Sequence, residues 1–107
     1  MFARILEFVP KAEKKEEFVK AFKNNVLPIL KKQVGFLEVL PFFPEIKSDT
    51  AVMVSLWTEK RYAEAYQREW FPKCQEILKP YLTTPAAFKY YTVETRLCEN
   101  FEKALIA

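Results

Sequence analysis

Aromatic side chains with polar groups gather in the segment 55–82, SLWTEKRYAEAYQREWFPKCQEILKPYL. Trp57 ends a strand-like run, and a helical run follows it with Tyr62, Tyr66 and Trp70 at i, i+4 spacing. Rings that meet where a strand, a turn and a helix join would form the wall of an apolar pocket. Buried indole N–H and phenol O–H groups need hydrogen-bond partners, which a ligand can supply. We therefore take Trp57 and Tyr66 as candidate catalytic residues, and Tyr62 and Trp70 as candidate ligand-binding residues.

Met53 and Ser55 share a strand face with Trp57, because strand side chains alternate between two faces. Both are therefore further candidate ligand-binding residues. Ser55 has no visible base that would activate it as a nucleophile. No carboxylate clearly falls on this face, so an obvious general base is also missing. Ordinary core packing would explain the same aromatic residues, and this alternative stays open.

Several kinds of chemistry are excluded by residues that the chain lacks. It has no His, which removes a Ser-His-Asp triad, a His-ligated zinc and a His-ligated haem. Its single glycine, Gly35, cannot form a Gly-rich phosphate loop. The two cysteines, Cys74 and Cys98, are too few for a zinc site. We expect Cys74 to be a core residue, leave the role of Cys98 open, and expect no metal site and no cofactor.

Size and charge indicate one ordinary domain over residues 1–107. The net charge of +3 comes from 17 basic and 14 acidic residues, a balance that does not favour nucleic-acid binding. No apolar run approaches the ~18 residues that a membrane span requires. No signal-peptide pattern precedes the first strand-like segment, so we expect a cytoplasmic protein with reduced thiols.

The order of the predicted elements is β-α-β-β-α-β. The patterns indicate strands at 1–9, 35–43, 50–59 and 87–95, helices at 11–33 and 60–81, and a short amphipathic helix within 96–107. Pro28 and Pro72 should bend or divide the two long helices, and Gly35 should end the first. This order predicts a ferredoxin-like α+β fold, with two helices on one face of a four-stranded antiparallel sheet.

Both faces of the predicted sheet are apolar. In the third strand Val52, Val54 and Leu56 occupy one side, whereas Met53 and Trp57 occupy the other. One helical layer covers only one face, which leaves a larger apolar patch than monomers usually expose. We therefore expect a homodimer that packs sheet against sheet with two-fold symmetry.

The chain resembles the antibiotic biosynthesis monooxygenase (ABM) superfamily. The matching segments are VSLWTEK at 54–60, YAEAYQREWFPKCQEILKPYL at 62–82, and LPILKKQVGF at 27–36 with its proline-bearing turn before Gly-Phe. The resemblance covers nearly the whole chain in order and length. It implies a dimeric α+β barrel, and its quinone-forming members are monooxygenases that work without a metal or flavin.

The quinone-forming members place an Asn, a Trp and a Tyr around the pocket. Trp57 matches the Trp of this set. The Asn position, four residues earlier, holds Met53, and the Tyr position holds Ala63 beside Tyr62. Catalytic roles therefore transfer only in part.

The haem-degrading branch requires a His on the second helix. The aligned position lies near Glu76, and Tyr66 stands where that branch has a second Trp. Since the chain contains no His, haem degradation is not expected.

Three functions fit these observations. The first is a cofactor-independent monooxygenase-like enzyme that acts on a small apolar aromatic or polyketide-like substrate. The second is a non-catalytic dimer that binds a small hydrophobic ligand. The third is a dimeric interaction domain whose pocket is filled by its own side chains.

Overall fold

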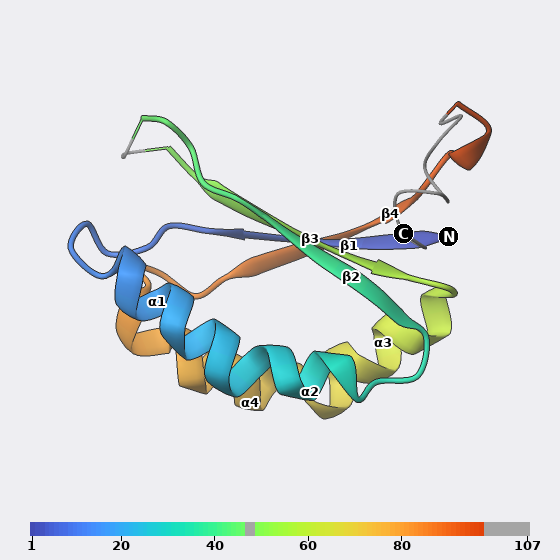
Figure 1. Ribbon diagram of the computed structural model, residues 1–107, viewed down its shortest axis with the longest axis horizontal. Helices are drawn as coiled ribbons and strands as arrows, with labels where there is room; N and C mark the ends of the chain where they lie inside the picture. Colours follow the sequence, from blue (N-terminus) through green and yellow to red (C-terminus); the bar gives the residue numbers. More distant parts are fainter. Residues whose placement is uncertain (47–48, 98–107) are drawn as a thin grey trace.

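The computed structural model describes residues 1–46 and 49–97 and has the predicted order of elements (Figure 1). The strands are Phe2–Phe8 (β1), Phe36–Phe42 (β2), Ala51–Trp57 (β3) and Ala87–Thr92 (β4). The longer helical segments are Lys15–Ala21 (α1), Phe22–Val26 (η1), Leu27–Lys31 (α2), Lys60–Glu69 (α3) and Phe71–Leu78 (α4), and short 3-10 turns span Lys79–Tyr81 (η2) and Thr95–Leu97 (η3). Cys98 and most of the helix expected at 96–107 lie outside the described residues.

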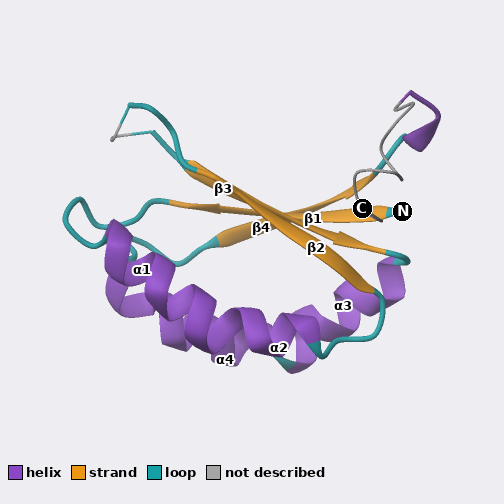
Figure 2. Cartoon of the chain, viewed as in Figure 1, coloured by secondary structure: helices purple, strands orange, loops and turns teal. Residues whose placement is uncertain are grey.

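The strands form one antiparallel sheet in the order β2-β3-β1-β4. All the longer helices lie on the same side of this sheet (Figure 2). The ferredoxin-like α+β prediction is therefore confirmed. Pro41 lies in β2, an edge strand, where a missing backbone N–H is tolerated.

The first helical region is divided near Pro28, as predicted. A π-helical stretch, η1, separates α1 from α2, and Pro28 lies in the first turn of α2. Proline is tolerated there because backbone N–H groups of a first helical turn need no partner within the helix. Gly35 then turns the chain into β2 with φ at +82°, a conformation that suits glycine.

The second helical region is divided at Trp70, with Pro72 in the first turn of α4. The i, i+4 spacing of Tyr62, Tyr66 and Trp70 predicts one shared buried face. For Trp70 this prediction is wrong, because its side chain is 38% exposed whereas Phe71 is 4% exposed. At the break, Phe71 rather than Trp70 turns into the core. Beyond it, Phe71, Cys74 and Leu78 face the core.

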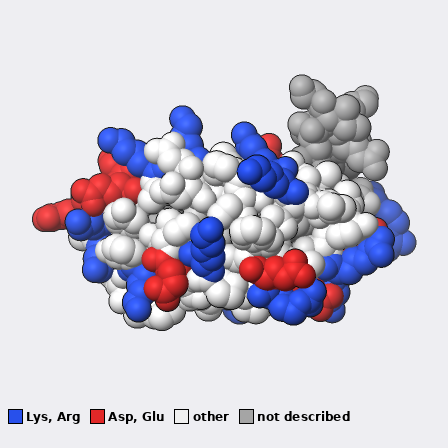
Figure 3. Space-filling model, turned by 90° about the horizontal axis from the view of Figure 1, so that it is seen from below, with Lys and Arg blue, Asp and Glu red and all other residues white. Residues whose placement is uncertain are grey.

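The two faces of the sheet differ in what covers them. Phe2, Arg4, Leu6 and Phe8 of β1 alternate onto the helix-covered face, where they are buried. The opposite face carries cross-strand rows such as Leu40–Val54–Ile5 and Phe42–Val52–Glu7. Acidic and basic side chains are interspersed over the solvent side of the helical layer (Figure 3).

Candidate active site

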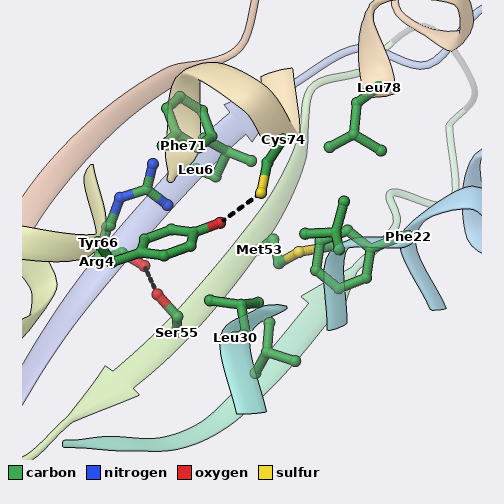
Figure 4. Close-up of a pocket in the computed structure, with 12 residues that line it drawn as sticks. Arg4, Leu6, Phe22, Leu30, Met53, Ser55, Tyr66, Phe71, Cys74 and Leu78 are labelled. Atoms are coloured by element: carbon green, nitrogen blue, oxygen red, sulfur yellow. Dashed lines mark hydrogen bonds between the residues drawn. The ribbon is translucent and has the colours of Figure 1, made fainter. Parts of the chain in front are cut away.

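A small cavity lies between the helices and the sheet (Figure 4). Its apolar wall includes Leu6, Phe22, Leu30, Met53, Phe71 and Leu78. Its polar wall consists of Arg4, Ser55, Tyr66 and Cys74. The cavity volume is about 20 Å³, which is room for roughly one water molecule. In this state the surrounding side chains nearly fill the site.

Arg4 places a positive charge beside this cavity. The residue is only 4% exposed, because β1 turns it toward the helices. Its Nε donates a hydrogen bond to Gln67 Oε1 at 2.9 Å, and its Nη2 donates to the same oxygen. The guanidinium carbon also lies 4.2 Å from the ring centre of Phe71 and 5.3 Å from that of Tyr66. Burial lowers the pKa of the guanidinium from its usual value.

Tyr66 and Cys74 meet across the break between α3 and α4. The Tyr66 hydroxyl donates to Cys74 Sγ at 3.4 Å, and both residues are buried. Burial raises the pKa of the Tyr66 phenol and that of the Cys74 thiol. Both groups therefore stay protonated near neutral pH, so Tyr66 is a hydrogen-bond donor that can turn toward a ligand.

Trp57 lies behind the cavity wall. Its indole is fully buried between Phe36 and Tyr66, with ring centres 5.5 and 5.6 Å away. Its Nε1 donates to Ser55 Oγ at 2.9 Å, and the Ser55 hydroxyl donates to the Arg4 carbonyl at 3.3 Å. Trp57 therefore supports the wall through Ser55 and Tyr66.

The structure brings together three of the six residues selected from the sequence. Met53, Ser55 and Tyr66 line the cavity, and Trp57 is the supporting residue just described. Tyr62 packs over Gly35, and its hydroxyl accepts a hydrogen bond from Arg61. Like Trp70, it does not line the cavity. Cys74 is fully buried, which confirms its predicted place in the core.

Arg4, Phe22 and Phe71 were not selected from the sequence. A signal for Arg4 was present, because alternation along β1 places it on the same face as Phe2 and Leu6. A charged residue in such a row has to find a partner. Nothing local identifies Phe71, whose orientation depends on the break at Trp70.

An outer groove adjoins the cavity. It has a volume of about 430 Å³ and runs between the first helical region and β2, past Phe18, Leu27 and Phe43. Phe22, Val39 and Met53 line both the groove and the cavity. These side chains form the partition between the two spaces, so their movement would join them.

Residues 1–46 and 49–97 contain no group of three or more His, Cys, Asp or Glu side chains that could hold a metal ion. No helix within these ranges has the length and apolar character needed to cross a membrane.

No family model and no curated protein matches the sequence. Solved structures do match. SnoaB, a cofactor-independent oxygenase from Streptomyces nogalater, is 17% identical with a TM-score of 0.72, over 92% of this chain and 97% of that one. A monooxygenase from the gene ActVA-Orf6 of Streptomyces coelicolor, in complex with nanaomycin D, is 17% identical with a TM-score of 0.69, over 87% of each chain.

A Caulobacter crescentus protein described as an antibiotic biosynthesis monooxygenase is 14% identical, with a TM-score of 0.70 over 87% of this chain and 90% of that one. The chain has the ABM fold. At 14–17% identity this likeness establishes the fold alone, so function has to be inferred from the cavity itself. Within the ABM fold, Met53 lines the cavity of this chain, and Ala63 is buried in the core without lining it.

Proposed function

We propose that the protein is a cofactor-independent monooxygenase-like enzyme that acts on a small apolar aromatic or polyketide-like substrate in the cavity. The observation that carries the proposal is a mostly apolar cavity that presents the Arg4 cation and the Tyr66 phenol. The ABM fold supports it, because SnoaB has the same fold and is a cofactor-independent oxygenase.

The proposed reaction converts a ring methylene group and O₂ into a ring ketone and water. The substrate carbanion gives its electrons to O₂ and forms a carbon–oxygen bond, and loss of water leaves the ketone. No metal or flavin has to carry electrons, because the substrate supplies them. The protein's part is to orient the substrate and to stabilise its anion with donors that already point to the site.

The described residues that line the cavity include no carboxylate. The substrate must therefore be acidic enough to ionise with little help, as anthrones are, because their ring methylene lies opposite a ring carbonyl. An anion of this kind would be stabilised by Arg4 and by the Tyr66 hydroxyl. Tyr66 is accordingly the residue on which turnover should depend most directly among those selected from the sequence.

A substrate of two or three rings needs more space than the closed cavity offers. Phe22 and Met53 stand between the cavity and the outer groove. Met53 has an unbranched, adaptable side chain, and Phe22 begins the π-helical segment, a kind of irregularity that often occurs at functional sites. We propose that substrate enters from the groove by displacing these two side chains.

Turnover of a panel of substituted anthrones under air tests the proposal, with quinone absorbance as the signal. Wild type should form product faster than buffer alone, and Tyr66→Phe should lose most of that rate. Tyr62→Phe is the matched control, because Tyr62 lies outside the cavity, and it should keep the rate. If wild type forms product no faster than buffer alone across the whole panel, the proposed enzymatic activity is refuted.

The small volume of the cavity favours a second candidate function, a dimeric interaction domain with a filled pocket. A non-catalytic protein that binds a small hydrophobic ligand is the remaining alternative. Binding of ring compounds without turnover would favour the non-catalytic ligand-binding function. Absence of any binding would favour the interaction domain with a filled pocket.

We propose that a second copy of the chain covers the open sheet face. Leu40, Phe42 and Tyr91 are 41%, 55% and 49% exposed on this face. Burying about 800 Å² of it on each partner, at roughly 25 cal/mol per Å² of apolar area, would strongly favour association. Light scattering at micromolar concentration should give about twice the chain mass of 12.7 kDa, and a value near 12.7 kDa would refute the dimer.

A further inference from the structure

Arg4 is a buried cation with no acidic partner among the residues that the structure describes. Within the described part of the chain, its guanidinium donates only to Gln67 Oε1, a neutral oxygen. None of the ion pairs found among residues 1–46 and 49–97 includes it. Buried charged groups are normally paired, because loss of hydration is costly for an ion without a counter-charge.

The surrounding rings replace only part of this lost hydration. Phe71, Tyr66 and Phe88 hold the guanidinium among ring faces at 4.2 to 5.3 Å. Ring faces attract a cation but bring no negative charge, and their attraction is smaller than the hydration that an ion loses on burial. A guanidinium has five N–H groups, and the single Gln67 oxygen accepts from two of its nitrogens. The remaining donors have no protein acceptor within the described residues.

We propose that Arg4 binds an ionised oxygen of the ligand, so that the cavity selects aromatic anions such as carboxylates, phenolates or enolates. The flat guanidinium can offer two parallel N–H groups to such an oxygen or oxygen pair. The Tyr66 hydroxyl, which now donates to the weak acceptor Cys74 Sγ, lies on the same cavity wall and is a second donor for the ligand. Leu6, Leu30 and Leu78 line the apolar part that would receive the hydrocarbon rings.

The residue at position 67 supports this selectivity. A glutamate there would neutralise Arg4 from within the protein, and glutamate is nearly isosteric with glutamine. Gln67 instead holds the guanidinium in place and leaves its charge available to a ligand. The proposal rests on the cavity being the ligand site of the proposed function, and it does not require turnover.

A pair of probes with the same rings tests the proposal: the anion 2-naphthoate and the neutral 2-naphthamide, titrated by calorimetry without any turnover assay. Wild type should bind naphthoate at least about ten-fold more tightly, which corresponds to about 1.4 kcal/mol. Arg4→Gln should remove this preference, and Arg4→Lys should restore part of it. Arg68→Gln is the matched control, because Arg68 is an exposed arginine of the same helix as Gln67. It should keep the preference.

Gln67→Glu provides a second variant that does not remove the cation. The new carboxylate should pair with Arg4 and abolish the preference for naphthoate. The circular dichroism spectrum of this variant should match that of wild type, which would show that the fold is kept. The proposal is overturned if wild type does not distinguish the two probes, whether both bind or neither does, or if Gln67→Glu retains the preference. Because these titrations measure only binding, the two proposals can fail separately. A protein that selects the anion but forms no quinone would refute the proposed monooxygenase activity and would still support anion binding by Arg4.

Discussion

The Trp57 indole and the Ser55 hydroxyl are joined by a buried hydrogen bond of 2.9 Å. Ser55 Oγ accepts from the indole Nε1 and donates to the Arg4 carbonyl, so its hydroxyl proton already has an acceptor. Ser55 is therefore a link between β3 and β1 within the cavity wall, and it is not arranged as a nucleophile. Through this link Trp57 supports the strand segment that carries Arg4.

Removal of the Ser55 hydroxyl should leave the Trp57 N–H buried without a partner. We expect Ser55→Ala to lower the free energy of unfolding by about 1–3 kcal/mol. In a Trp57→Phe background the same change should cost less, because no buried donor is left unpaired. A double-mutant cycle by urea unfolding measures this coupling, and additive effects of the two substitutions would contradict the described link.

Gly35 should not tolerate a side chain. A Cβ at this position would lie 2.2 Å from Cδ2 of the Tyr62 ring, and φ is +82°. We expect Gly35→Ala to lower the free energy of unfolding by more than the roughly 1–2 kcal/mol of a left-handed backbone alone. In a Tyr62→Ala background the cost should fall, because the ring clash is gone and only the backbone penalty and a 2.9 Å contact with Thr58 Oγ1 remain. Equal costs in both backgrounds would show that the ring does not set the requirement for glycine.

Alkaline pH should weaken the fold through Cys74 and Tyr66. Burial raises both pKa values in the folded protein, so the folded state holds these protons more tightly than the unfolded state does. The associated stability is present below the unfolded thiol pKa of about 8.5, and it is lost as pH rises through the folded values. Unfolding free energies measured from pH 7 to pH 11 should therefore decline.

Cys74→Ala should make this alkaline decline shallower by at most about 1.4 kcal/mol per pH unit. A cavity left by the smaller side chain would lower stability equally at every pH, so the change in slope reports the thiol together with its contact with the Tyr66 hydroxyl. An unchanged slope would show that the buried thiol does not contribute to the pH dependence.

Charge on the open sheet face should dissociate the proposed dimer. Val54 lies at the centre of the row Leu40–Val54–Ile5, so Val54→Glu should place a carboxylate within the apolar interface. We expect sedimentation to show a folded species of half the wild-type mass. Val19→Glu makes the same change on α1, where Val19 is 38% exposed, and should leave the mass unchanged. A Val54→Glu protein with the wild-type mass would contradict association through this face.

Local sequence features predicted most of the fold. Pro28, Pro72 and Gly35 marked the breaks and turns correctly, because the backbone limits of proline and glycine act within a few residues. The exposure of Trp70 was not predictable, because the chain breaks between α3 and α4 at this residue and Phe71 occupies the core position instead.

The candidate site was predictable only in part. Met53, Ser55 and Tyr66 followed from periodicity within single elements. The setting of Arg4 depends on Gln67 and Phe71, which lie more than sixty residues away in the sequence. Whether a buried cation is paired is decided by such distant contacts, and no local pattern reports it.

Oxygen labelling tests the proposed monooxygenase most directly. The purified protein would be supplied with an anthrone under ¹⁸O₂ in unlabelled water, and the quinone would be analysed by mass spectrometry with a no-enzyme control subtracted. The proposed reaction predicts one ¹⁸O atom in each enzyme-dependent product molecule, with the second oxygen atom released as water. Product without the label, or no product beyond the control, would contradict it.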